Sequence, residues 1–194
     1  MNHDQYDDNY IRGILNTVKT IAMVGASPVN VRPSYFAFKY LAQRGYDMIP
    51  VNPGHVGKDL LGKPFVASLA EIGRPVDMID IFRNSSHIMP VVEEAIKLPT
   101  PPKVIWMQLG ARDYAAAAKA EAAGIKVVMN RCPKIEYGRL SSEIAWMGVN
   151  SRTLSSKRAP VPTQGMRLSL NRVSVGGGST SASDRVAKDK TELT

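Results

Sequence analysis

The sequence predicts an α/β protein: a doubly wound parallel sheet of about five strands with helices on both faces. Five short apolar segments recur along the chain, and segments of helical length separate them. Each apolar segment ends in a polar, glycine-bearing or basic turn. Strands that alternate with helices are typical of parallel sheets, because each crossover returns through a helix packed on the sheet.

Residues 21–53 form the unit around which we expect the rest of the chain to be organised. Ile21–Val24 and Asp47–Val51 are apolar strands, and a helical segment over Tyr35–Arg44 lies between them and stops at Gly45. This order is a βαβ unit. The turn after its first strand is where such folds hold nucleotide phosphates, since the helix N-terminus offers free N–H groups and the positive end of its dipole.

The residues of that turn suit an anionic ligand. Gly25 permits a tight turn, Ala26 leaves room for a ligand, and Ser27 or Ser34 supplies a hydroxyl or caps the helix. Arg32 carries a permanent charge that can bind phosphate through two hydrogen bonds. The G-x-G-x-x-G fingerprint and the Gly-Lys-Ser/Thr ending of a P-loop are both absent. By itself the turn is equally consistent with an ordinary connection that carries a surface arginine.

The second strand ends in Val51-Asn52-Pro53, where an NAD site has an acidic residue for the ribose hydroxyls. We therefore expect a nucleotide other than NAD.

The remaining pattern extends the same alternation. A helix is expected over Asn9–Lys19, and further strands over Val76–Phe82, Val104–Leu109 and Ile125–Met129. Ligands of such sheets bind beyond the carboxyl ends of the strands, near the switch in strand order. The candidate site segments are the five strand ends, namely Gly25–Ser27, Val51–Pro53, Phe82–Asn84, Gln108–Gly110 and Asn130–Cys132.

Composition limits the cellular setting and the partners. No apolar run is long enough to cross a bilayer, and the first eight residues are acidic and polar, unlike a signal peptide. The single cysteine excludes an internal disulfide framework, so a reducing cytoplasm is expected. Three scattered histidines and one cysteine lack metal-ligand spacing, which argues against a metal site.

Residues 151–194 differ in character from residues 1–150. They hold eight of the 25 Lys/Arg and three of the 17 Asp/Glu, and they include the linker-like stretch Val175–Thr180. We expect a flexible basic tail after one domain. No basic run interleaved with aromatic residues indicates nucleic-acid binding.

Several segments together closely resemble the family of small stand-alone CoA-binding domains, which is similar to the N-terminal domain of the succinyl-CoA synthetase alpha subunit. The resemblance covers roughly residues 9–140 and implies a Rossmann-like fold that holds coenzyme A or an acyl-CoA along the strand ends. The segments that carry it are Val24–Ser27, Arg32–Ser34, Val51–Pro53, Val104–Gly110 and Asn130–Tyr137.

The resemblance also implies positions for the ligand. The nucleotide portion would contact the turn after the first strand, and the end of the second strand would border it. The pantetheine would pass the end of the third strand, and its reactive end would lie near the end of the fourth strand. In that order the residues are Gly25, Ala26, Ser27, Arg32 and Ser34; Val51, Asn52 and Pro53; Phe82 and Arg83; and Gln108, Leu109 and Gly110, with Asn130 and Cys132 from the fifth strand end.

A ligand-binding protein without catalysis of its own is the expected function. In the synthetase a phosphorylated histidine belongs to a second domain, which this chain is too short to contain. The alternative is a module of an acyl-CoA ligase or transferase that needs a partner subunit, and a protein partner or a homo-oligomer is compatible with either. Cys132 is interpreted as a small residue at a crowded strand end; the other interpretation is a thiol that meets the CoA thiol, activated by Arg131.

Overall fold

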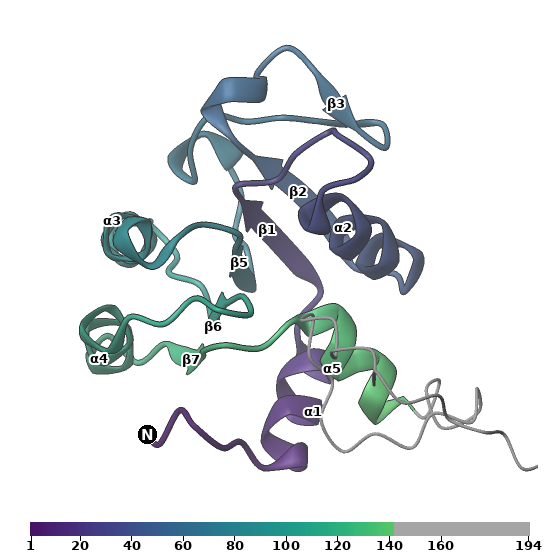
Figure 1. The fold of residues 1–194 in the computed structure, drawn as a ribbon. Coiled ribbons are helices and arrows are strands. Elements are labelled where there is room, and N and C mark those ends of the chain that lie inside the picture. Colours follow the sequence, from purple (N-terminus) through teal and green to yellow (C-terminus); the bar gives the residue numbers. More distant parts are fainter. Residues whose placement is uncertain (142–194) are drawn as a thin grey trace, which may run out of the picture. The chain divides into compact units, whose positions relative to one another are not determined.

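The computed structural model describes residues 1–141, in which five parallel strands form one sheet (Figure 1). The strand order is β2-β1-β5-β6-β7. Their bounds are β1 Thr20–Val24, β2 Asp47–Val51, β5 Met78–Ile81, β6 Val104–Met107 and β7 Lys126–Val128. The expected domain boundary at residue 150 and the expected tail over 151–194 lie outside the described residues.

Helices cover both faces of this sheet. Their bounds are α1 Asp8–Thr17, α2 Pro33–Gln43, α3 Ile88–Ile96, α4 Tyr114–Ala122 and α5 Pro133–Leu140. Short 3-10 turns lie at Pro53–His55, Ala70–Ile72 and Ser85–His87, and a small antiparallel hairpin is formed by β3 Asp59–Leu60 and β4 Lys63–Pro64.

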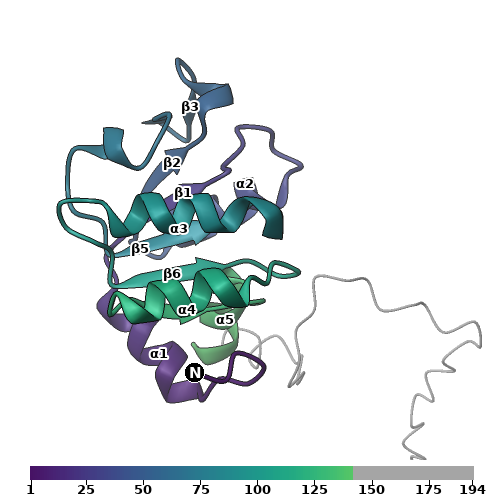
Figure 2. The ribbon, with the colours of Figure 1, turned by 90° about the vertical axis from the view of Figure 1, so that its left-hand side faces the viewer.

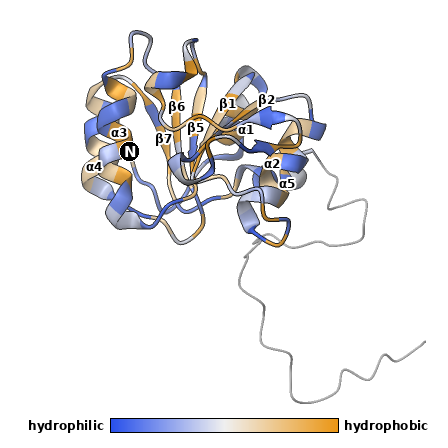
Figure 3. Ribbon diagram, turned by 90° about the horizontal axis from the view of Figure 1, so that it is seen from above, coloured by the Kyte–Doolittle hydropathy of each residue, from blue (hydrophilic) through white to orange (hydrophobic). Residues whose placement is uncertain are grey.

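The alternation of side chains along the strands creates two cores. On one face, strand residues such as Met23, Met48 and Trp106 pack with α1, α2 and α5. On the other face, Ile79 and Met107 pack with α3 and α4, which lie side by side (Figure 2). Viewed from above, the apolar strands lie between the two helical layers (Figure 3). Burial on both faces explains why the strands are continuous apolar runs rather than alternating ones.

Local sequence accounts for where the flanking helices begin. The carboxylate of Asp7 accepts a hydrogen bond from the Asn9 N–H at 2.8 Å and caps α1. Pro33 begins α2, where its missing N–H costs nothing. The N-cap of α2 is Arg32, which makes no capping hydrogen bond through its side chain. Of the two roles expected for Ser27 or Ser34, capping of this helix is therefore wrong, and the supply of a hydroxyl to a ligand stays a prediction.

The sheet reverses its order between β1 and β5. From β1 the chain first adds β2 on one side and then returns to add β5 on the other. Connections leave the two strands toward opposite sides at such a switch, so a crevice opens beyond their carboxyl ends. Backbone hydrogen bonds hold these ends in register, from the Gly25 N–H to the Val51 carbonyl at 2.9 Å and from the Phe82 N–H to the Val24 carbonyl at 2.8 Å.

The structure confirms the predicted fold class, a Rossmann-like α/β sheet of five parallel strands with helices on both faces. Helix α5, which follows directly after the fifth strand end, was not predicted, and neither was the β3–β4 hairpin. Among residues 1–141, no helix combines the length and apolar character needed to pass through a bilayer.

Candidate functional site

A cavity of about 770 Å³ lies at the carboxyl ends of β5, β6 and β7, beside the first turns of α2 and α5. Its volume is in the range of cavities that bind drug-sized ligands or cofactors. It is lined by Val31, Pro33, Phe36, Ala37, Phe82, Arg83, Asn84, Ser85, Gln108, Leu109, Gly110, Ala111, Cys132, Lys134 and Ile135.

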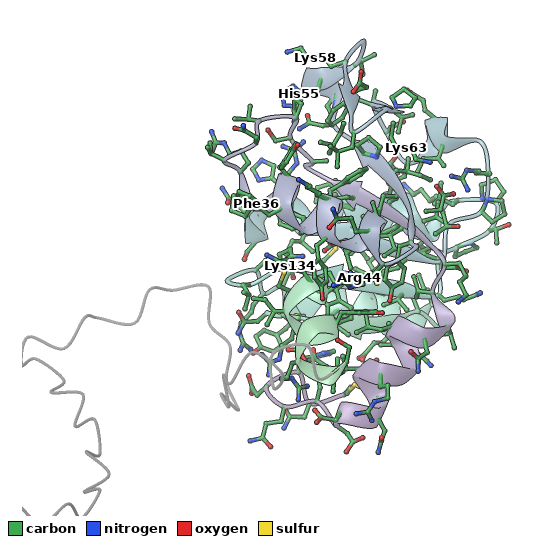
Figure 4. The ribbon with its side chains drawn as sticks, turned by 90° about the vertical axis from the view of Figure 1, so that its right-hand side faces the viewer. Phe36, Arg44, His55, Lys58, Lys63 and Lys134 are labelled. Carbon is green, nitrogen blue, oxygen red and sulfur yellow. The ribbon has the colours of Figure 1, made fainter. Side chains whose placement is uncertain are left out.

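The cavity combines an apolar wall with cationic side chains. Val31, just before α2, and Phe36, in its first turn, are 74% and 50% exposed despite their size, so their apolar surface is available at the rim. Arg83 and Lys134 contribute the positive charges. Phe36 and Lys134 lie on the same face of the molecule, although they come from different helices (Figure 4). This lining suits a ligand with a flexible, partly apolar arm and anionic groups.

Gly25 fixes the turn that follows β1. Its φ of +84° lies in the left-handed region, and a Cβ at this position would come within 2.4 Å of the Phe82 carbonyl oxygen. The close approach of β1 and β5 at the switch point therefore requires glycine. Ala26 is buried directly after it, so this turn offers a ligand mainly backbone.

Three further predicted residues lie between Gly25 and α2. The Ser27 hydroxyl accepts a hydrogen bond from the Val29 N–H at 3.2 Å and shapes the loop. Arg32 is exposed beside the cavity-lining residues Val31 and Pro33. Ser34 is buried in the first turn of α2. Because no side-chain cap covers the start of α2, its dipole end faces this loop and favours an anion there.

Two asparagines connect neighbouring strand ends. The Asn52 side chain donates to the Ala26 carbonyl at 2.8 Å, which links the ends of β2 and β1. The Asn130 side chain accepts from the Gly110 N–H at 2.8 Å and links the ends of β7 and β6, and its own φ is +53°. These side chains hold the turns together, which accounts for their positions at strand ends.

The structure thus divides the predicted site residues into two groups. Six line the cavity: Phe82, Arg83, Gln108, Leu109, Gly110 and Cys132. The others do not line it: Gly25, Ala26, Ser27, Arg32, Ser34, Val51, Asn52, Pro53 and Asn130. Within the second group, the Val51 side chain is buried in the core on the face of α3 and α4.

Sequence reasoning missed several of the lining residues. Lys134 and Ile135 belong to α5, whose start is signalled only by Pro133 and by the acidic Glu136 in its first turn. Val31 and Phe36 carry no sequence signal for exposure. Asp80 was detectable from the sequence as a candidate site residue, because it is a carboxylate inside the apolar run Met78–Ile81.

Asp80 lies in β5, completely buried behind the cavity. One carboxyl oxygen, Oδ1, accepts a hydrogen bond from Gln108 Nε2 at 2.8 Å. The other, Oδ2, has no hydrogen-bond partner within residues 1–141. Burial raises the pKa of Asp80 to about 7, and the hydrogen bond from Gln108 opposes that rise only in part.

Cys132 is buried at the N-cap of α5 and contributes to the cavity lining. Burial raises the pKa of its thiol to about 11, and the neighbouring Asp80 carboxyl raises it further than burial alone. Arg131 does not activate this thiol, because its guanidinium donates to the Asn130 and Asp4 carbonyls and lies over the Tyr6 ring. The thiol is neutral at neutral pH, so the predicted activation by Arg131 is wrong.

None of the three histidines lines the cavity, and within the described residues no group of three or more His, Cys, Asp or Glu is arranged to hold a metal ion.

Comparisons with known proteins agree with this architecture. An uncharacterised protein of Bacillus subtilis, YneT, is 35% identical over 127 residues, which are 66% of this chain and 91% of the relative. A solved Thermus thermophilus structure is 38% identical, with a TM-score of 0.66 over 70% of this chain and 99% of the other. A hypothetical protein of Pyrococcus horikoshii is 38% identical, with a TM-score of 0.67 over 73% of this chain and 96% of the other.

The sequence model of one family, described as a CoA binding domain, matches residues 19–138. This range contains the whole sheet, the turn after β1 and every residue that lines the cavity. The chain belongs to the family of CoA-binding domains.

Proposed function

We propose that this protein is a cytoplasmic carrier or sensor that binds coenzyme A, or an acyl-CoA, at the carboxyl edge of its sheet without catalysing a reaction. The observation that carries the proposal is the cavity beside the switch point, in a chain that belongs to the CoA-binding family. The single cysteine supports a reducing compartment.

The nucleotide portion of the ligand lies over the turn after β1 in this proposal. Gly25 and Ala26 let the backbone approach the ligand closely, and the uncapped start of α2 favours the phosphates. Arg32 is exposed at that start and supplies a charged hydrogen bond to a phosphate oxygen. Asn52 and Pro53 border this portion from the end of β2, with Asn52 already joined to Ala26.

The pantetheine arm enters the cavity. From the turn after β1 it passes Phe82 and Arg83 and reaches Gln108, Leu109 and Gly110. The exposed apolar surfaces of Val31 and Phe36 would be covered by the arm or by an acyl group, which contributes hydrophobic stabilisation.

The chemistry of the cavity favours binding over catalysis. The only thiol of the chain is neutral there, and no histidine lines the cavity. A nucleophile and a base within hydrogen-bond reach of one another would be needed for acyl transfer through a covalent intermediate.

A ligase or transferase module with a partner subunit is the second candidate. The exposed Val31 and Phe36 at the cavity rim favour it, since a partner could cover them and supply the missing catalytic groups. Copurification of an acid–thiol ligase subunit would support this candidate. A stable isolated protein that binds CoA without such a subunit supports the first.

Calorimetric titration of CoA into wild type and Arg32→Ala tests the proposed site. Loss of one charged hydrogen bond to phosphate should weaken binding by roughly 1.5–3 kcal/mol. The melting temperature without ligand should barely change because Arg32 is exposed. Arg12→Ala is the matched control and should bind CoA as wild type does, because Arg12 is an exposed arginine on α1 that donates to Asn9 in its own helix.

Two results would contradict parts of this proposal. Wild type that does not bind CoA would contradict the function itself. Full affinity in Arg32→Ala would leave the ligand in place and remove Arg32 from its site.

A further inference from the structure

The polar pair beneath the cavity consists of Asp80 in β5 and Gln108, which directly follows β6. Asp80 lies in register between Met23 of β1 and Trp106 of β6, at a position where the other strands carry apolar side chains. A fully buried carboxyl group with one unpaired oxygen is destabilising unless it is neutral or serves a ligand.

Gln108 connects this carboxyl group to the cavity. Its side-chain nitrogen Nε2 donates to Asp80 Oδ1 at 2.8 Å, so the orientation of the amide is set from below. Its amide oxygen Oε1 has no hydrogen-bond partner within residues 1–141 and is not among the fully buried unpaired atoms. Since Gln108 lines the cavity, Oε1 is the polar atom that it leaves for a ligand.

We propose that Asp80 is a positioning residue: it orients the Gln108 amide so that Oε1 presents a hydrogen-bond acceptor to the cavity, and the site thereby selects a ligand group that donates a hydrogen bond. This inference rests on the proposed function, in which the ligand arm reaches Gln108. In a ligand of the CoA class the donor is either the terminal thiol S–H or an amide N–H of the pantetheine arm. A thioester has lost the first of these donors and keeps the second.

The charged and titratable groups around Asp80 determine its protonation state, which is part of the proposed mechanism. Gln108 faces it from β6, and the titratable Cys132 interacts with it from the segment that begins α5. Arg83 and Lys134 line the cavity, but neither forms an ion pair with Asp80 within the described residues. With no cation to offset burial, the carboxyl group holds its proton to about pH 7, and the proton belongs on the unpaired Oδ2.

The ionised carboxylate can only accept a hydrogen bond and so holds Nε2 of Gln108 toward Asp80, whereas the neutral carboxyl group can also donate to Oε1. The wild-type preference for a hydrogen-bond donor on the ligand should therefore strengthen as the pH rises through the pKa of Asp80, from pH 6 to pH 8. Phosphate groups of the ligand also titrate near pH 6. The ratio of wild-type to variant affinity removes that contribution, because both proteins bind the same ligand.

Calorimetric titration of CoA and of acetyl-CoA into wild type and Asp80→Asn, at pH 6 and pH 8, tests the inference. Asparagine keeps the shape but can donate to Oε1, which would turn Nε2 toward the cavity. We expect Asp80→Asn to bind CoA about 3- to 10-fold more weakly at pH 8, where the wild-type carboxylate is ionised and can only accept, the equivalent of one hydrogen bond. The wild-type advantage should shrink at pH 6, where the neutral carboxyl group has an O–H and can donate to Oε1 as asparagine does.

Acetyl-CoA identifies the donor. A loss of affinity on acetylation in wild type that disappears in Asp80→Asn assigns the donor to the thiol. Equal affinity for both ligands in wild type, with the same loss for both in the variant, assigns it to an amide N–H.

Controls separate this inference from the proposed function. Glu93→Gln makes the same carboxyl-to-amide change on a partly exposed residue paired with Lys119 and should bind CoA as wild type does. If Asp80→Asn does not fold, Gln108→Leu, which removes Oε1 and leaves Asp80 in place, should give a loss of the same size. Wild type that fails to bind CoA contradicts the proposed function. Wild type that binds CoA, with variants that match it at both pH values, overturns only the role of Asp80.

Discussion

Buried and half-buried carboxylates have many partners at the amino edge of the sheet and few at the carboxyl edge. At the amino edge, Asp77 accepts hydrogen bonds from the Lys19 and Thr20 N–H groups at 2.9 and 3.1 Å and pairs with Lys103 at 2.7 Å. Asp47, the first residue of β2, likewise pairs with Lys63 and Arg74. At the carboxyl edge, Asp80 has one hydrogen bond and one unpaired oxygen within residues 1–141.

The pKa values follow this difference. Burial tends to raise the pKa of Asp77, but hydrogen bonds from Lys103, Lys19 and Thr20 outweigh it and hold the pKa below its ordinary value. Burial also raises the pKa of Asp80, and Gln108 alone does not offset it. The amino edge is thus arranged for stability, whereas the carboxyl edge keeps unsatisfied groups and an open cavity, as expected where α/β sheets bind ligands.

The largest expected effect comes from substitution of the glycine at the carboxyl edge. Gly25→Ala should lower the free energy of unfolding by about 2–5 kcal/mol, from a left-handed backbone and an overlap with the Phe82 carbonyl. Gly124→Ala is the matched control near the amino edge, with φ +80° and no atom within 4 Å of the added Cβ. It should cost only about 1–2 kcal/mol.

Chemical denaturation of both glycine variants measures this difference. Equal losses would show that β1 and β5 are not in close contact at the switch point, and the geometry described for that end of the sheet would be wrong.

A change of pH is expected to have a smaller effect on stability. Its sign is opposite for Asp77 at the amino edge and Asp80 at the carboxyl edge. The contribution of Asp77 to stability is present above its unfolded pKa near 4 and is lost as the pH falls below it, since its folded pKa is lowered. Asp80 has a raised folded pKa, so the folded state binds its proton more tightly than the unfolded state. Stability therefore falls as the pH rises from about 4 to about 7.

Thermal melts of wild type, Asp77→Asn and Asp80→Asn between pH 3 and pH 8.5 resolve the two contributions. Relative to wild type, Asp77→Asn should be destabilised at neutral pH and should recover as the pH falls below 4. The melting temperature of Asp80→Asn should rise relative to that of wild type as the pH rises from 5 to 8.5. Parallel curves for Asp80→Asn and wild type would show that Asp80 does not titrate in this range.

The sequence predicted the sheet because each strand is a continuous apolar run and each turn has its own local signal. Gly25 and Pro33 are such signals, and both have the role that their residue types suggest. Helix capping at α2 was not predictable in the same way, since two serines lie near its start and neither caps it. Helix α5 was missed because its apolar residues are few and Gly138 interrupts them.

The candidate site was predicted as a set of strand ends but not as a cavity. Gln108 and Cys132 were named because they follow strands, and the fold brings them together. The contributions of Phe36 and Lys134 depend on how α2 and α5 pack on the sheet, which no local pattern encodes. The importance of Asp80 lies in Oδ2, which has no hydrogen-bond partner in the described part of the chain, and only three-dimensional structure reveals this.

The central claim is that the carboxyl edge binds CoA, and the direct test is the thermal stabilisation of wild type by CoA and by NAD at equal concentration. A ligand that binds only the folded state raises stability by mass action, about 2.7 kcal/mol at a concentration of 100 times its Kd. NAD has no pantetheine arm to occupy the cavity. The end of β2 carries Asn52 rather than an acidic residue for the ribose hydroxyls of NAD. We expect CoA to raise the melting temperature clearly more than NAD. An equal or larger increase with NAD would contradict the account.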